Sequence, residues 1–250
     1  MMPRVVAAET LDGLTEDDPA AMRSRRDLQR VHRAMNTRAI VVRALRALTA
    51  FHPAGAPLRL LELGAGEGSL MLGVARALQG QWPAVQLTLL DRQHLVTRST
   101  LARYADAGWS VSAQVMDVFD WVAADESSPP ERSTGPWDVV ISNLFLHHFE
   151  GVPLVSLLAA IESRTTSFFA CEPRRARLAL AASHLIGAIG ANAVTREDAV
   201  LSVHAGFRDA EISALWPGRA AGWTLNEYSA GLFSHCFCAR RIKPQAAATP

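Results

Sequence analysis

Three glycines alternate with other residues in the sequence LLELGAGEGSL, which runs from Leu60 to Leu70, and Glu62 stands two positions before the first of them. Gly64, Gly66 and Gly68 lack a Cβ, so their backbone can take positive φ and let a ligand approach the main chain closely. The spacing G-x-G-x-G departs from the dinucleotide fingerprint G-x-G-x-x-G, and the Gly-Lys-Ser/Thr of a P-loop is missing. A carboxylate at Glu62 would repel a pyrophosphate, whereas it suits a cationic ligand or an ammonium group. An ordinary strand-to-helix turn is the alternative interpretation.

Two further acids stand where later apolar runs end. Asp91 closes the run VQLTLLD, and Asp117 follows SAQVM, directly before Val118. Asp91 could accept hydrogen bonds from both hydroxyls of a ribose. Asp117 could accept one from the exocyclic amine of an adenine, with Val118 packed near the base. Each acid by itself could be a solvated loop carboxylate, but three acids at the ends of successive strands favour a nucleoside site.

Polar side chains also follow the apolar run WDVVIS. Asn143 comes first, and His147 and His148 follow shortly after it. A histidine there could remove a proton from a phenol, an enol or an acid, because its pKa lies near neutrality. A structural role, in which the histidine caps the loop or packs near a ligand, is the alternative.

The sequence CEPRR offers a second group of polar residues, Glu172, Arg174 and Arg175. Arginines at this position could hold a carboxylate or an enolate through paired hydrogen bonds. The start of a solvated helix is the alternative. Because arginine at a helix N-terminus opposes the helix dipole, the functional interpretation gains some weight.

Strand patterns and helix patterns alternate through the middle of the chain. This alternation predicts an α/β fold with a parallel sheet covered on both faces. The sequences GWTLNEYSAG and LFSHCFCARR predict an antiparallel pair at the sheet edge. DESSPPERSTGP, at 125–136, predicts a polar loop, and Thr195 with Asp198 has the spacing of a capping box at a helix start.

Composition excludes several classes of protein. The chain of 250 residues is 49% apolar and has a net charge of +1, which disfavours disorder and gives no basic surface for nucleic acid. We expect neither nucleic acid nor stable membrane insertion, since no apolar run reaches the ~18 residues of a membrane span. Cys171, Cys236 and Cys238 form neither a disulfide framework nor a zinc pattern, so we expect buried thiols, a reducing cytoplasm and no metal site.

The stretch from Leu58 to Phe149 resembles the class I S-adenosylmethionine (SAM)-dependent methyltransferases. LLELGAGEGSL resembles their glycine-rich motif, LTLLD their ribose-binding acid and MDVFDW their adenine-contacting acid. WDVVISNLFLHHF resembles the fourth-strand motif of the small-molecule branch, which includes the ubiquinone and menaquinone methyltransferases. The DNA and protein amide branch carries a Pro-Pro pair after its Asn or Asp, and Asn143-Leu144-Phe145 does not. The residues that the resemblance assigns to the cofactor are Glu62, Gly64, Ala65, Gly66, Gly68, Asp91, Arg92, Asp117, Val118 and Asn143.

The resemblance also implies an architecture: a Rossmann-like, doubly wound, mostly parallel seven-stranded sheet with an antiparallel C-terminal strand. Residues 1–52 then form a lead-in and a helical cap, 53–242 the methyltransferase domain and 243–250 a disordered tail. Additions of this kind often cover the pocket in this family, so His32 and Met35 could contact substrate together with Arg174 and Arg175. Ordinary packing is the alternative for the first two. A monomer and a homodimer are both compatible with the sequence.

These observations predict an enzyme that transfers a methyl group from SAM, with S-adenosylhomocysteine (SAH) as product, to a small-molecule acceptor. A phenol, quinol, enol or carboxylate, methylated on oxygen or carbon in secondary metabolism or quinone biosynthesis, is the expected acceptor. His147, His148 and Asn143 are the candidate catalytic residues. The alternatives are a non-catalytic binding or scaffold protein of the same fold, an NAD-dependent oxidoreductase and an RNA methyltransferase. The glycine spacing opposes the oxidoreductase, and the near-neutral charge opposes the RNA enzyme.

Overall fold

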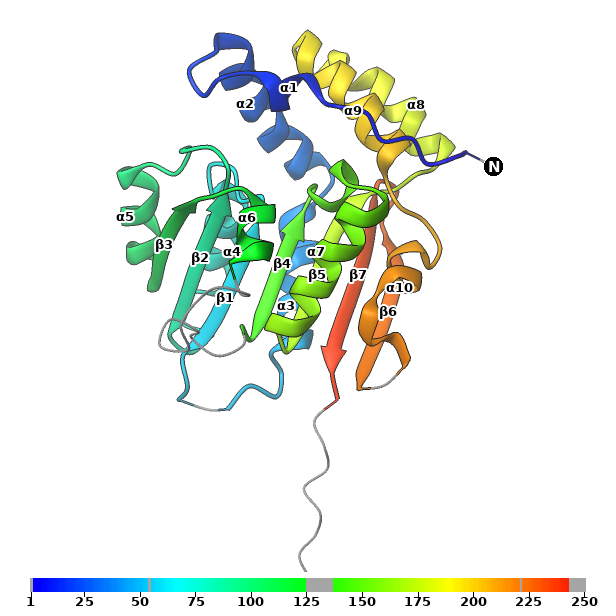
Figure 1. Ribbon diagram of the computed structural model, residues 1–250. Helices are drawn as coiled ribbons and strands as arrows, with labels where there is room; N and C mark the ends of the chain where they lie inside the picture. Colours follow the sequence, from blue (N-terminus) through cyan, green and yellow to red (C-terminus); the bar gives the residue numbers. More distant parts are fainter. Residues whose placement is uncertain (1, 54, 125–136, 221, 243–250) are drawn as a thin grey trace, which may run out of the picture.

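The computed structural model describes residues 2–53, 55–124, 137–220 and 222–242. The polar loop expected at 125–136 and the tail expected at 243–250 lie outside the described residues. A seven-stranded sheet with the strand order β3-β2-β1-β4-β5-β7-β6 forms the centre of the molecule (Figure 1). Its strands are β1 (Leu58–Leu63), β2 (Val85–Asp91), β3 (Trp109–Val115), β4 (Val139–Asn143), β5 (Ser167–Pro173), β6 (Trp223–Ala230) and β7 (Ser234–Arg241). The predicted architecture is confirmed.

The strand order places the candidate residues at one edge of the sheet. β1 pairs in parallel with β2 on one side and with β4 on the other, so the order of strands reverses direction at β1. Ligands of doubly wound sheets bind at the carboxyl ends of the strands next to such a reversal. β7 runs antiparallel between β5 and β6, as the final two strand patterns predict.

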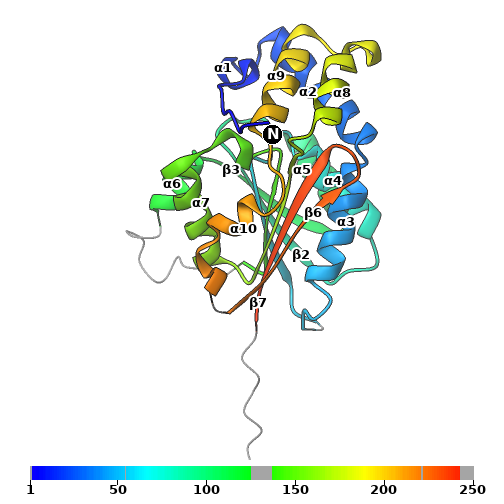
Figure 2. The same cartoon turned by 90° about the vertical axis from the view of Figure 1, so that its right-hand side faces the viewer.

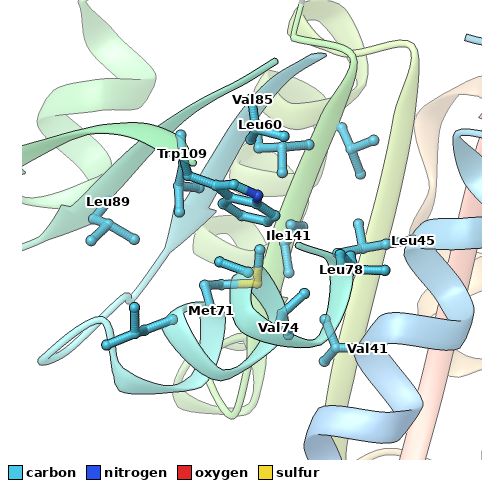
Figure 3. Close-up of a cluster of buried hydrophobic side chains, with 14 of the residues drawn as sticks. Val41, Leu45, Leu60, Met71, Val74, Leu78, Val85, Leu89, Trp109 and Ile141 are labelled. Carbon is cyan, nitrogen blue, oxygen red and sulfur yellow. The ribbon is translucent and has the colours of Figure 1, made fainter. Parts of the chain in front are cut away.

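Apolar side chains alternate between the two faces of the sheet and form a core on each. Leu60 lies in the core on one face and its neighbour Leu61 in the core on the other. Figure 2 shows the two helical layers on either side of the sheet, and Figure 3 shows the core beneath α3 and α4, where Val41 meets Val74. The helices are α3 (Thr37–Leu48), α4 (Ser69–Leu78) and α5 (Arg98–Asp106) on one face, and α6 (Val118–Ala123), α7 (Gly151–Arg164) and α10 (Glu211–Leu215) on the other.

The cap over the carboxyl edge of the sheet comes from two distant parts of the chain. α1 (Thr10–Gly13) and α2 (Pro19–Ala34) lie beside α8 (Arg177–Leu185) and α9 (Ala193–Ala205) above the strands (Figure 1). The break between α2 and α3 falls at Asn36, whose φ of 55° is left-handed. Beyond this break, α3 packs on the sheet layer rather than in the cap.

The expected capping box at the start of α9 is wrong. The helix begins earlier, and the side chain of Asn192 is its cap, accepting a hydrogen bond from the Thr195 amide at 2.8 Å. Asp198 instead accepts hydrogen bonds from the amides of Thr10 and Leu11, at 2.8 and 3.0 Å. The carboxylate of Asp198 therefore bonds to a distant segment of the chain and not to the helix end that its local spacing predicts.

The three cysteines are free thiols, and Cys171 and Cys236 are buried at facing positions of β5 and β7. Among the described residues, no helix combines the length and the apolar character that crossing a bilayer requires.

Candidate active site

The glycine turn joins β1 to α4, and all three glycines have positive φ, between 55° and 70°. A Cβ on Gly64 would collide with the ring of Phe145, so this glycine lets the loop after β4 approach. A Cβ on Gly66 would meet nothing within 4 Å, because this position faces open space. Gly68 packs against Leu89 instead. Gly64 and Gly66 thus line the cavities next to the turn, whereas Gly68 packs against the protein core.

Glu62 and Asp91 lie beneath this turn, at the ends of β1 and β2. Glu62 is 3% exposed, and its Oε2 has no hydrogen-bond partner among the described residues. Burial, and secondarily the charge of Asp91, raise the pKa of Glu62 well above its usual range. Asp91 is fixed by the amides of Gly66 and Gln93, which donate to its two oxygens at 2.7 and 2.9 Å. A buried carboxyl group with one unpartnered oxygen next to a bare turn suits a cationic or ammonium-bearing ligand better than an anionic one.

Asp117 lies at the end of β3 and caps α6. Its Oδ1 accepts a hydrogen bond from the amide of Phe119 at 2.8 Å. Arg92, which the resemblance assigned to the cofactor, points its guanidinium to Asp12 on the N-terminal segment, with 3.2 Å between Nη2 and Oδ1. The expected nucleoside-binding acids therefore lie at adjacent strand ends, and the guanidinium of Arg92 beside them is paired with the cap.

Asn143 ends β4 and contacts the cap helix α2. Its amide Nδ2 lies 3.3 Å from Nε2 of His32, and its Oδ1 is buried without a hydrogen-bond partner among the described residues. Burial lowers the pKa of His32 to about 4, so the ring is neutral at pH 7 and can accept the amide hydrogen. Leu144 follows with φ of 50°, a left-handed conformation that is costly for a branched side chain.

Glu172 organises the loop that carries the two histidines. Its buried carboxylate accepts hydrogen bonds from the backbone amides of Phe145, Leu146 and His147, at 3.0 to 3.3 Å. It also accepts one from Nδ1 of His147 at 2.8 Å, while Nε2 of that ring lies 3.3 Å from Glu9. Burial opposes the charge on this ring, but the two carboxylates outweigh it and raise the pKa of His147 to about 9. His147 is therefore a clamped imidazolium without a free nitrogen to accept a proton.

His148 has a different environment in η1 (Leu146–His148). Its side chain is 21% exposed, and Nδ1 lies 3.2 Å from Oδ2 of Asp12. This pairing orients the ring and leaves Nε2 as the nitrogen available for proton transfer. Glu9, His147 and His148 also bring ligand-type atoms within 4.8 Å of one another, a grouping of the kind that can hold a metal ion.

Three adjacent cavities surround these residues. The turn cavity, of about 150 Å³, lies between Glu62, the glycine turn, Asn143 and His32. The strand-end cavity, of about 270 Å³, is lined by Asp91, Asp117, Val118, His147 and His148 among others. The apolar cavity, of about 320 Å³, lies between α2, α8 and α9. Leu28 and Leu144 line all three, so the cavities meet at this pair of side chains.

The predicted site residues divide by position. Glu62, Gly64, Ala65, Gly66, Asp91, Arg92, Asp117, Val118, Asn143, His32, His147 and His148 line the first two cavities, and Met35 lines the apolar one. Gly68, Arg174 and Arg175 line none of the three. Arg175 is buried, and it donates to the carbonyls of Met2 and Gly206 and to the carboxylate of Glu211. These internal hydrogen bonds occupy the guanidinium of Arg175, for which the sequence predicts binding of an acidic substrate.

Sequence reasoning predicted His32 and Met35 from the cap but missed other residues that the cap contributes. Glu9, Asp12 and Leu28 enter the site from the N-terminal segment, and nothing in their local pattern marks them. The sequence pattern distinguishes Leu144 only by the absence of a proline at this position. Its place in the site becomes apparent only from the left-handed backbone conformation that the structure shows.

The sheet order, with one antiparallel strand between its neighbours, is that of the class I SAM-dependent methyltransferases, and solved structures of that class share the fold. The plantazolicin methyltransferase BpumL with bound SAH has a TM-score of 0.64 at 12% identity, over 91% of this chain and 92% of that one. An O-methyltransferase family protein from Burkholderia thailandensis has a TM-score of 0.59 at 16% identity, over 90% and 60%. Magnesium protoporphyrin IX methyltransferase (ChlM) from Synechocystis PCC 6803, with bound SAH, has 0.50 at 15% identity, over 84% and 83%. The sequence matches no protein-family model and no curated protein.

Proposed function

We propose that the protein is an enzyme that transfers the methyl group of SAM to a small-molecule acceptor. The observation that carries this proposal is Glu62, a fully buried carboxylate with an unpartnered oxygen beside a bare glycine turn. Asp91 and Asp117 extend the same row of acids along the strand ends. Such a row suits a cationic sulfonium with a nucleoside, and it would repel the pyrophosphate of NAD. The SAH or SAM bound in several proteins of similar fold supports the assignment.

The residues present would hold the cofactor in three parts. Asp91 would accept hydrogen bonds from the ribose, Asp117 from the adenine amine, and Glu62 with Asn143 would face the amino-acid portion in the turn cavity. When bound, SAM supplies an electrophilic methyl group. The protein itself would align the acceptor and exclude water. We assign both tasks to the cap, because it covers the strand ends.

His148 is the residue that we propose as the base for the acceptor. Asp12 orients its ring, and His147 cannot serve in this conformation because both its nitrogens face carboxylates. The proton of an acceptor hydroxyl would pass to Nε2 of His148. A base of this kind favours oxygen methylation of a phenol, quinol, enol or carboxylate, although a phenolic ring carbon needs similar residues. Secondary metabolism or quinone biosynthesis, in the cytoplasm, is the setting that the small-molecule resemblance favours.

Calorimetric titration of the purified protein with SAM, SAH and NAD tests the proposal. We expect binding of SAM and SAH at micromolar concentrations and none of NAD. Binding of NAD alone would replace the proposal with an oxidoreductase. Binding of SAM without methylation of any phenol, quinol, enol or carboxylate would favour the scaffold alternative.

A further inference from the structure

The apolar cavity is lined by none of the residues that are predicted to hold the cofactor. It lies between α2, α8 and α9, and its volume of about 320 Å³ is within the range of small-molecule pockets. Aliphatic side chains from all three helices line it, including Val31, Ala34, Met35, Ala182, Ile186 and Val203. Its walls therefore come from both of the distant segments that make the cap.

The polar side chains in these walls are already hydrogen-bonded to other protein groups. Ser24 bonds to Thr195 at 2.8 Å, and Ser183 donates to the carbonyl of Leu180 at 2.8 Å. Asp198 accepts from the two amides at the start of α1, and Ser202 donates to Glu9. A hydrocarbon would leave all of these hydrogen bonds in place and would need no polar partner from the walls.

The apolar cavity adjoins the place where chemistry would occur. Leu28 and Leu144 line it together with the turn cavity and the strand-end cavity. Leu144 directly follows Asn143 and is held in a left-handed conformation, so its side chain is fixed at the junction by the turn of the chain. An acceptor with its reacting group near Asn143 and His148 can therefore extend a second part into the apolar cavity.

We propose that the apolar cavity binds an aliphatic chain carried by the methyl acceptor. The acceptor class is then an amphipathic small molecule with an oxygen-bearing head, such as a phenol, and a hydrocarbon tail. This inference builds on the proposed methyl transfer, because it places the head by the strand ends. The cavity itself can be tested without turnover.

The first measurement is binding of phenols with alkyl chains of increasing length, by calorimetry in the presence of SAH. Each added methylene should tighten binding about fourfold, the factor that corresponds to the ~0.8 kcal/mol of burying one methylene, until the cavity is full. With SAM in place of SAH, kcat/KM should follow the same course. An affinity that does not change with chain length would overturn the proposal.

Two neighbouring alanines on α8 provide a matched pair of variants. Ala182 lines the cavity and Ala181 is exposed to solvent. Ala182→Phe should abolish the gain from long chains, while Ala181→Phe should leave it intact. Met35→Ala enlarges the cavity and should move the plateau to longer chains, which provides a second test if Ala182→Phe fails to fold.

The two proposals fail in distinguishable ways. Tail-length-dependent binding that Ala182→Phe removes, without methylation of any acceptor, would retain the cavity assignment and overturn the proposed function. Methylation that is indifferent to tail length and to Ala182→Phe would retain the function and overturn the cavity assignment.

Discussion

The carboxyl edge of the sheet and the cap face each other across the same cavities, yet they are assembled differently. Glu62, Asp91 and Asp117 lie in consecutive strand–helix units, each one at or directly after the end of its strand. The cap instead combines residues 2–34 with 177–205, and its contacts to the site are long-range hydrogen bonds and ion pairs. Under the proposed function, the sheet edge would hold the cofactor and the cap would contact the acceptor.

This difference has a functional meaning that substitutions can test. Changes at the sheet edge should alter cofactor affinity, and changes in the cap should alter turnover, acceptor preference or stability. The loop of Leu146–His148 lies between the two regions, because Glu172 fixes it from the sheet and Glu9 and Asp12 contact it from the cap.

The largest effect is expected at His148. His148→Ala should lower kcat by about 100-fold or more, because a positioned base contributes roughly 10²–10⁴ to the rate. SAM affinity should remain nearly unchanged. Steady-state kinetics with a phenolic acceptor and calorimetry with SAM measure the two quantities. His94→Ala, at an exposed histidine after β2, is the control. Wild-type kcat in His148→Ala would show that the acceptor needs no base at this position.

Asp91→Ala should weaken SAM binding about 100-fold, or roughly 3 kcal/mol, because charged hydrogen bonds to the ribose are lost. The acceptor's chain-length preference should persist at saturating SAM, since the cap is untouched. Asp106→Ala removes an exposed acid at the end of α5 and serves as the control. An unchanged dissociation constant would remove the ribose assignment and with it the contrast between sheet edge and cap.

The cap should lose stability in acid through His32. Burial lowers the pKa of this histidine to about 4, from about 6.5 in the unfolded chain, so the unfolded state binds the proton more readily. The free energy of unfolding should therefore fall as pH decreases from about 6.5 to 4, by about 2 kcal/mol, given the partial exposure of the ring. Urea unfolding of the wild type and of His32→Gln across this range isolates the effect. Parallel pH profiles for the two proteins would contradict the prediction.

The smallest effect belongs to Glu62. Burial raises its pKa in the free protein, and a cationic ligand beside it favours ionisation, so SAM binding should release up to one proton. Affinity for SAM should accordingly rise with pH. Calorimetry in two buffers of different ionisation enthalpy measures the released proton. Glu62→Gln should abolish the release, and a release that survives this change would place the proton elsewhere.

The sheet edge could be predicted from sequence because its signals are local. Apolar runs that end in Glu62, Asp91 and Asp117 define both the strands and their functional ends, and the glycines mark the turn between them. The cap could not be predicted in the same way. Asp198 has the spacing of a helix cap but bonds to α1, and the site-like Arg175 is taken up by carbonyls and Glu211. A local sequence pattern predicts that a polar side chain bonds to groups nearby in the chain. The tertiary structure also brings it partners that are distant in the sequence, and these can win.

The contacts of Glu9 and Thr10 also bear on the order in which the cap and the sheet can fold. The hydrogen bond of Glu9 to His147 joins residues 138 positions apart, its bond to Ser202 spans 193 positions, and the bond of Thr10 to Asp198 spans 188. Closing such long loops costs entropy that only later contacts recover, so segments of this kind join slowly. During synthesis, the N-terminal segment leaves the ribosome before α9 does, and it cannot dock on α9 until that helix has been made. The part of the sheet from β1 to β4 can therefore form while the chain is still growing, and the N-terminal segment joins it only after α9 has been made.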